Sequence, residues 1–310
     1  MVSNKLRFKR VFMTVIIVFV IVSVINFGAT KIIYDKIFSR YDCATEQKFG
    51  EITNDRKIYD FKSGKNTLRG YLYQSEAKTD KDTLIVFAVG HKACSNDYLW
   101  QIKELLDLGW SVFTFDPTGC CDSQGKNEVG FSQELLDLTS TLDYIEECNR
   151  FDCKEIALLG HSRGGYAVCC ALEYKYDISA VISIGGVNSA MEGIMGASRD
   201  YIGKLAYLNY GPLWLYQTML FGADVIDLKA NEVIEKSNVP TLIIHGANDE
   251  QVPTDKFSIY SYKNINRNKN VEYLLFDAPE NSGHVDILFD EDKSANDALI
   301  GKINDFLIGI

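Results

Sequence analysis

The sharpest chemical signal in this chain of 310 residues is a serine at the centre of a G-x-S-x-G pattern. Residues 160–164 carry the pattern around Ser162, after the apolar run 156–159 and before helix-like periodicity that begins at Arg163. Between a strand and a helix such a turn is sharp, and the serine hydroxyl projects above the sheet edge. The flanking positions need glycine because a side chain there would collide with a neighbouring strand or helix. The pattern predicts that Ser162 is a nucleophile; an incidental turn serine is the alternative.

A serine hydroxyl is a poor nucleophile at neutral pH, so a neighbouring imidazole must accept its proton. The chain has only four histidines. His161 is adjacent to Ser162 and is expected to point away from it. His245 lies at the end of an apolar β run, and His91 follows the third expected strand. His284 lies in a loop between the last strand and the final helix, and it is predicted as the base; a surface loop histidine is the alternative.

An acid must hold that imidazole in the right tautomer and stabilise the imidazolium. Asp249 follows the apolar run 241–244 and precedes His284, which gives the chain order Ser, Asp, His that accompanies this kind of nucleophile. We therefore expect Asp249 to be the acid. Its neighbour Glu250 is the rival, and a solvated surface carboxylate is the ordinary alternative.

An oxyanion intermediate needs two backbone N–H donors, one from the residue after the nucleophile and one from the loop after the third strand. The first donor is expected to be the amide of Arg163. The second is expected to be the amide of His91, with Lys92 as the alternative.

These residues have to be positioned by a sheet, because the chain after residue 57 alternates β-like runs with helix-like ones. The expected strands are 57–61, 67–73, 83–89, 111–116, 155–159, 180–184, 241–245 and 271–276. The middle runs are continuously apolar, which is typical of parallel strands covered on both faces. Helical periodicity at 97–108, 132–148, 163–174 and 296–308 supplies the crossovers. The pattern predicts an α/β fold with a mostly parallel eight-stranded sheet.

About 55 residues between Gly185 and Val239 break this alternation and are too many for an ordinary connection. The segment is rich in aromatic residues: Tyr201, Tyr207, Tyr210, Trp214, Tyr216 and Phe221. We expect a cap insertion after the sixth strand that folds over the nucleophile, with rings such as Trp214 and Tyr210 lining an apolar slot that sets substrate choice. An extra helical layer with no part in binding is the alternative.

From about residue 57 to 310 the chain resembles the α/β-hydrolase superfamily, in particular the bacterial serine hydrolases grouped with monoacylglycerol lipases and serine aminopeptidases. Residues 116–125, DPTGCCDSQG, are similar to that family's D-x-x-G-x-G-x-S-x-G loop after the fourth strand, with Cys121 in place of the second glycine. Residues 245–253, HGANDEQVP, are similar to its H-G-x-x-D-x-x-V-P segment, which carries the triad acid.

The resemblance implies the α/β-hydrolase fold and a triad of Ser162, Asp249 and His284. The chain departs from the family in the oxyanion loop, where residues 89–91 read VGH instead of the usual H-G-x. The triad does not depend on that change, because backbone donors tolerate different side chains.

The first thirty residues predict a membrane anchor. Residues 11–30 carry no charge, and at about 1.5 Å per residue they make roughly 30 Å of helix, the thickness of a bilayer's hydrocarbon core. A cleaved signal peptide and a buried core helix are the alternatives. The positive-inside rule places the basic tail 1–10 in the cytoplasm and the body outside, although Lys31, Lys36 and Arg40 weaken that orientation. The expected order is tail 1–10, single-pass anchor 11–30, juxtamembrane segment 31–56 and hydrolase domain 57–310.

Composition and cysteine spacing narrow the function further. The chain is 46% hydrophobic and 24% charged with a net charge of -10, which indicates a globular protein and disfavours a nucleic-acid partner. An oxidising exterior would permit disulfides among the eight cysteines, and Cys148 and Cys153 flank a short turn that a bridge could close. No C-x-x-C pair occurs, so buried thiols are favoured over a zinc site.

The sequence thus predicts a membrane-anchored serine hydrolase that cleaves a small acyl ester through an acyl-Ser162 intermediate, with no metal or organic cofactor. One alternative is a peptidase that removes small N-terminal residues. It would need acidic side chains in the insertion, where Glu192 and Asp200 are candidates. The other alternative is a non-catalytic binding protein on a hydrolase scaffold.

Overall fold

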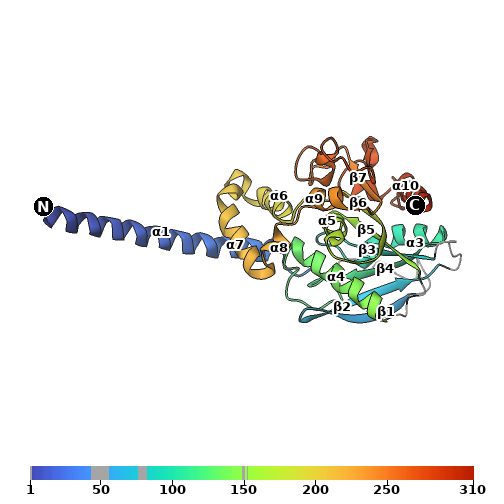
Figure 1. Ribbon diagram of the computed structural model, residues 1–310, viewed down its shortest axis with the longest axis horizontal. Helices are drawn as coiled ribbons and strands as arrows, with labels where there is room; N and C mark the ends of the chain where they lie inside the picture. The colour runs from blue at the N-terminus through green and yellow to red at the C-terminus, as the bar shows by residue number, and fades with distance from the viewer. Residues whose placement is uncertain (1, 43–55, 76–81, 149–150, 152) are drawn as a thin grey trace.

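The computed structural model describes the chain except for residues 1, 43–55, 76–81, 149–150 and 152. Part of the expected juxtamembrane segment, residues 43–55, therefore lies outside the described residues. An eight-stranded sheet forms the centre of the body, with a long helix extending away from it (Figure 1).

The sheet has the strand order β1-β2-β4-β3-β5-β6-β7-β8. Its strands are β1 (Lys57–Ser63), β2 (Asn66–Tyr73), β3 (Thr83–Ala88), β4 (Ser111–Asp116), β5 (Glu155–His161), β6 (Ile178–Ile184), β7 (Thr241–Gly246) and β8 (Val271–Phe276). β2 pairs antiparallel with β1 and β4, and the pairs from β4 through β3 to β8 are parallel. The predicted mostly parallel eight-stranded sheet is confirmed.

Helices cover both faces of the sheet because alternate strand residues point to opposite sides. On β3, Leu84 and Val86 join the core beneath α4 (Phe131–Cys148) and α5 (Arg163–Cys170). Ile85 and Phe87 join the core beneath α3 (Leu99–Asp107) and α10 (Asp297–Gly309). This two-sided burial explains why the central strands read as unbroken apolar runs. Short 3-10 turns complete the body: η1 (Ser95–Tyr98), η2 (Ala171–Glu173), η4 (Ile259–Tyr262), η5 (Pro279–Asn281) and η6 (Asp286–Leu288).

The insertion after the sixth strand is helical. Between β6 and β7 the chain forms α6 (Ala190–Ile202), η3 (Gly203–Asn209), α7 (Tyr210–Phe221), α8 (Ala223–Ile226) and α9 (Ala230–Lys236). Helix α7 packs beside the N-terminal helix (Figure 1), where the ring of Tyr216 makes edge contacts with Phe27 and Tyr34. The insertion therefore joins the N-terminal helix to the body.

The N-terminal helix α1 spans Val2–Ile37, so it continues past the uncharged run that ends at residue 30. Its apolar residues from Val11 to Ile25 are largely exposed, whereas Tyr34 and Ile37 are buried in the core of the body. The helix therefore has an exposed apolar part between Val11 and Ile25, which we call its shaft, and a buried end at Tyr34 and Ile37, which we call its base.

The cysteines differ from one expectation. Neither Cys148 nor Cys153 is disulfide-bonded, so the bridge across their turn is not formed. Cys121 is disulfide-bonded, and its backbone has a φ of 40°. This left-handed conformation explains why the resembling family uses glycine at that position.

Candidate active site

The turn between β5 and α5 holds Ser162 in a strained conformation, with φ at 56°. A Cβ atom at Gly160 would lie 2.3 Å from the carbonyl oxygen of Gly164, and one at Gly164 would lie 2.1 Å from that of Ala88. Both distances are far below van der Waals contact, so strand, turn and helix can approach this closely only with glycine at both positions. The strain at Ser162 is held in place by this packing.

The structure brings Ser162, His284 and Asp249 together in one chain of hydrogen bonds. The Ser162 hydroxyl lies 2.8 Å from Nε2 of His284, and Nδ1 of His284 lies 2.6 Å from Oδ2 of Asp249. All three residues are buried. With Nδ1 donating to the carboxylate, Nε2 presents its lone pair to the serine, which is the tautomer that can accept the hydroxyl proton. The rival carboxylate, Glu250, is exposed.

Asp249 is held as a carboxylate by its neighbours. Burial opposes its ionisation, but hydrogen bonds from His245 and His284 hold the pKa of this carboxyl below its usual range. Its Oδ2 lies 3.2 Å from Nε2 of His245, and its Oδ1 accepts the amide of Val252 at 2.7 Å. His245 thus contacts the same carboxylate oxygen as His284, and its Nε2 also lies 2.7 Å from the carbonyl oxygen of Val252.

Two polar contacts orient the peptide groups on either side of His91 in the loop after β3. The amide of Lys92 donates to the carboxylate of Glu128 at 3.2 Å, so this N–H already has an acceptor. Nη2 of Arg163 donates to the carbonyl oxygen of Gly90 at 3.2 Å. In a trans peptide the N–H points opposite to the C=O, so the amide of His91 points away from the Arg163 side chain.

The amides of Arg163 and His91, the two expected oxyanion donors, differ from the alternative donor, the amide of Lys92, which is already bonded to Glu128. The amide of Arg163 opens helix α5, where a helical N–H has no acceptor within the helix. The His91 amide is oriented by the contact between Arg163 and Gly90, while Lys92 is occupied. This geometry favours His91 over Lys92 as the second donor.

A buried ion pair behind the serine was not foreseen in the sequence. Nη1 of Arg163 lies 2.6 Å from Oε2 of Glu128, and the two side chains are 1% and 0% exposed. Burial would raise the pKa of the Glu128 carboxyl, but the charge of Arg163 and the contact with His91 hold it well below its usual range. The Arg163 side chain thus carries a charge that stabilises Glu128, while its backbone amide begins α5 directly after Ser162.

His161 links the two catalytic loops. Its Nε2–H donates to the carbonyl oxygen of His284 at 2.9 Å, and its Nδ1 accepts from the Tyr98 hydroxyl at 2.8 Å. That hydroxyl in turn accepts the amide of Gly90 at 3.0 Å. Burial lowers the pKa of His161 to about 3, so the ring is neutral and can make both contacts. As expected, the ring does not bond to the Ser162 hydroxyl.

A cavity of about 360 Å³ opens at the serine. It is lined by Tyr41, residues 90–93, 97 and 98, the turn at 161–162, Gln251, and residues 284, 285, 288 and 289. Among the described residues, none from the insertion at 185–239 lines it. The indole of Trp214 instead donates to Asp227 at 3.2 Å, and Tyr210 is exposed. The expectation that these two rings line the substrate slot is therefore not supported, because α7 packs against α1.

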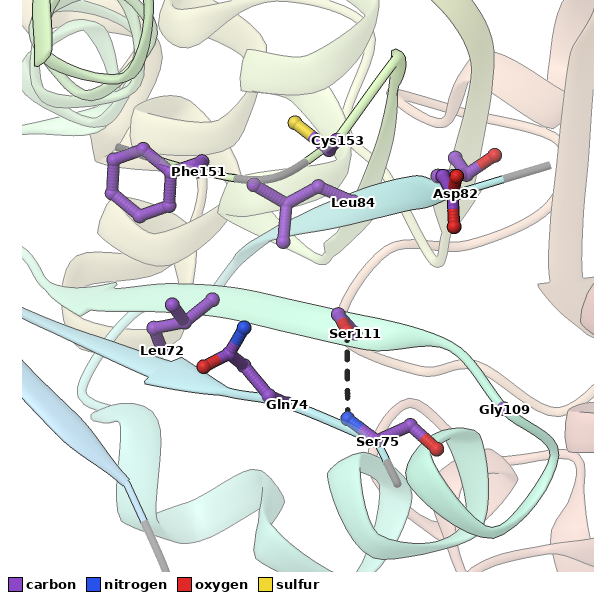
Figure 2. A pocket seen from close by; sticks show the side chains of 10 residues that line it. Leu72, Gln74, Ser75, Asp82, Leu84, Gly109, Ser111, Phe151 and Cys153 are labelled. Carbon is purple, nitrogen blue, oxygen red and sulfur yellow. Dashed lines mark hydrogen bonds between the residues drawn. The ribbon is translucent and has the colours of Figure 1, made fainter. Parts of the chain in front are cut away.

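Another cavity lies at the amino-terminal ends of β3 and β4, whereas Ser162 follows the carboxyl-terminal end of β5. Figure 2 shows Leu72 on β2, Gln74 directly after that strand, Leu84 on β3 and Ser111 on β4 around it. Its volume of about 30 Å³ has room for a water molecule and little else. Within the described part of the chain, no group of three or more His, Cys, Asp or Glu side chains is arranged to hold a metal ion. The cavity at Ser162 is the candidate substrate site because Ser162 and His284 both line it.

Comparison with known proteins agrees with this architecture. The family model of the α/β hydrolase fold matches residues 84–201. A proline iminopeptidase of Thermoplasma volcanium is 27% identical over 143 residues, which cover 43% of this chain and 45% of the relative. The chain thus matches less than half the length of that curated relative.

Solved structures extend the likeness over most of the body. A Pyrococcus furiosus esterase superposes with a TM-score of 0.66 at 18% identity, covering 88% of this chain and 98% of its own. Est1E from Butyrivibrio proteoclasticus has a TM-score of 0.60 at 18% identity, covering 81% and 98%. The Pyrococcus horikoshii acylaminoacyl peptidase has a TM-score of 0.54 at 18% identity, covering 76% of this chain and 38% of its own. The chain has the α/β-hydrolase fold.

The histidines provide a first test of the site. We expect His284→Ala to lower kcat by about 10³-fold or more, because it removes the group next to the Ser162 hydroxyl. His245→Ala should lower the melting temperature and reduce kcat by no more than about tenfold, since Asp249 keeps its bond to His284. The kcat for ester hydrolysis and the melting temperature, measured for both variants, show which histidine is the base. Loss of activity in a folded His245→Ala protein that exceeds the loss in His284→Ala would reassign the base.

Glu128 provides a second test. We expect Glu128→Gln to lower kcat by about tenfold to a hundredfold with little change in KM, because the loop at His91 and Lys92 loses its charged support. It should also destabilise the protein by about 3 kcal/mol, because Arg163 loses the nearer of its two buried carboxylate partners, Glu128 at 2.6 Å, and keeps Glu134 at 3.0 Å. The matched control is Glu147→Gln, which changes an exposed glutamate on α4. A folded Glu128→Gln variant with unchanged kcat would contradict this role.

Proposed function

We propose that this protein is a serine hydrolase that cleaves a carboxylic ester through an acyl-enzyme. Ser162 is the nucleophile, His284 the general base and Asp249 the acid that orients it. The observation that carries the proposal is the continuous hydrogen-bond chain of 2.8 Å and 2.6 Å through the His284 imidazole.

The reaction follows from this arrangement in two stages. His284 takes the Ser162 proton as the oxygen attacks the acyl carbon, and the negative charge that develops is met by the amides of His91 and Arg163. His284 then gives the proton to the leaving alkoxide. Water, activated by the same imidazole, hydrolyses the acyl-serine and restores the free enzyme.

An ester with an apolar acyl or aryl group suits the cavity best. The lining of the cavity includes Val285, Leu288 and Phe289, which follow His284 in the chain, and the aromatic residue Tyr41. Apolar walls with a few polar groups at the reacting centre are typical of sites for small organic substrates. The structural neighbour from Pyrococcus furiosus is named an esterase, and Est1E from Butyrivibrio proteoclasticus has been seen with ferulic acid bound.

A peptidase acting on small N-terminal residues is the second candidate, and one observation favours it. The carboxylate-bearing residue Asp97 lines the cavity, where it would face a substrate amine. The earlier candidate Glu192 instead interacts with Ser189 at the start of α6, and the side chain of Asp200 lies outside the described residues. The iminopeptidase relative supports this alternative.

We also propose that α1 anchors the enzyme in a membrane. Within the described residues, one helix segment, Lys9–Ile37, is long and apolar enough to cross a bilayer. Seven of the residues at 205–220 are large, apolar and exposed: Leu205, Tyr207, Leu208, Tyr210, Leu215, Met219 and Leu220. Because Asn209 and Tyr216 contact α1 at Thr30 and Phe27, this surface lies level with the end of the span. Contact with the bilayer would cover it.

The basic tail at residues 1–10 places that end in the cytoplasm and the catalytic body outside. A cleaved signal peptide remains the alternative to an anchor. The two differ in whether the mature protein retains the shaft of α1.

The nucleophile is tested with a probe and a substrate series. Ser162→Ala should lose labelling by a fluorophosphonate and lower turnover by three or more orders of magnitude, because the triad acts as a unit. Ser179→Ala, at a partly buried serine on β6, is the matched control and should retain both. Labelling retained in Ser162→Ala would identify another nucleophile.

Substrate class is decided on the wild-type protein with p-nitrophenyl acetate and octanoate beside prolyl and alanyl p-nitroanilides. We expect higher kcat/KM for the esters. Faster cleavage of the anilides would make the peptidase the better assignment.

Membrane attachment is tested by fractionation. The full-length chain should sediment with membranes and resist alkaline carbonate, and protease added to spheroplasts should digest the body. The double variant Ile17→Lys with Ile21→Lys should be released, since each charge near mid-span costs about 2.5 to 3.5 kcal/mol. Soluble protein that begins near Thr30 would show a cleaved signal, and a protected body in intact spheroplasts would reverse the orientation.

A further inference from the structure

The four residues after α1, Phe38–Tyr41, form an ordered segment on the body that we call the post-helix segment. The amide of Tyr41 donates to the carbonyl oxygen of Gly119 at 3.0 Å, and the amide of Cys121 donates back to the Tyr41 carbonyl at 2.8 Å. Ser39 forms an antiparallel bridge with Asn127. The segment is thus paired with the loop between β4 and α4 at both of that loop's ends.

Arg40 fixes the middle of the same loop. Its guanidinium donates to the carbonyl oxygens of Ser123 at 3.1 Å and Gly125 at 2.9 Å, and to that of Cys121. Three backbone acceptors held by one rigid, planar donor group leave the loop little freedom.

The post-helix segment also reaches the groups that hold the oxyanion loop. The amide of Glu128 donates to the carbonyl oxygen of Phe38 at 2.8 Å. The ring of Phe38 is fully buried and meets the imidazole of His91 edge-on, with ring centres 4.9 Å apart. Nζ of Lys92 donates to the Ser39 carbonyl oxygen and lies 3.0 Å from its hydroxyl. Three residues of the oxyanion region therefore depend on this segment.

Tyr41 stands in the catalytic cavity itself, which Ser162 and His284 also line. A substrate held in this cavity of about 360 Å³ would therefore lie within reach of Tyr41. The family model begins at residue 84, so the match does not include this residue.

We propose that the post-helix segment is part of the active site. Tyr41 contacts the substrate and sets its acyl preference, while Phe38 and Ser39 position the oxyanion loop through Glu128, His91 and Lys92. This inference rests on the proposed serine hydrolase function. It extends the catalytic unit upstream of residue 57, to the base of α1.

The specificity role is tested on the full-length chain in detergent micelles. Tyr41→Ala should change the ratio of kcat/KM for octanoyl over acetyl p-nitrophenyl ester about fivefold or more, since an apolar contact is lost from long acyl groups only. Tyr41→Phe, which keeps the ring, should stay within about twofold of the wild-type ratio. The matched control Tyr210→Ala removes an exposed ring of the insertion and should leave the ratio unchanged. An unchanged ratio in Tyr41→Ala overturns this role.

The positioning role has its own readout, the rate of phosphonylation by a small fluorophosphonate. Phe38→Leu should slow this rate and the kcat for acetyl ester together about tenfold, with KM unchanged, because the oxyanion donors are misplaced. Phe61→Leu is a comparable change at a buried ring in the same core and controls for lost stability. Equal rates in the two variants would overturn the positioning role. A wild-type protein that reacts with neither esters nor probe would refute the proposed function itself.

Discussion

Helix α5 lies so close to strands β3 and β5 that no Cβ atom fits at Gly160 or Gly164, and the strained turn at Ser162 depends on this approach. The same packing brings the Arg163 side chain beneath the loop after β3, where it meets Glu128 and the carbonyl oxygen of Gly90. The position of the loop after β3 is therefore coupled to the position of Ser162 through one buried residue, Arg163.

The buried pair of Arg163 and Glu128 is costly in isolation, because both charges leave water. Its contacts with the Gly90 carbonyl and the Lys92 amide give it a use that an apolar pair could not supply. A hydrophobic replacement of similar volume would leave these two backbone groups unpaired. Charge at this depth thus serves the geometry of the loop more than the stability of the fold.

Much of this architecture could be predicted from local patterns. All eight strands were located from β-like runs, and the signal was continuous in central strands such as β3 and β7, because these are buried on both faces. The candidates Ser162, Asp249 and His284 followed from a short motif, from chain order and from a short list of histidines, and the structure places them in contact. The Lys92 alternative could not be weighed in sequence, because its amide is occupied by a residue 36 positions away.

The missed features depend on long-range packing. Glu128 lies three residues beyond the motif at 116–125 in the loop between β4 and α4, and nothing in the sequence pairs it with Arg163. The rings of the insertion were expected over Ser162, but Tyr216 packs against α1, a helix far away in the sequence. The same contact and the burial of Tyr34 and Ile37 stabilise the helical turns after residue 30, so α1 is longer than the uncharged run.

The buried base of α1 has a mechanical consequence. An enzyme on a flexible tether sweeps a wide volume above its membrane and meets any substrate within reach. Here the helix enters the core without a hinge in the described chain between Val2 and Ile37, so the body cannot swivel freely about its stalk. With α1 across a bilayer, the mouth of the catalytic cavity would keep one height and one tilt relative to the lipid. The enzyme would then select substrates first by the distance of the scissile bond from the membrane surface. Contacts inside the cavity would act only on substrates that meet this condition.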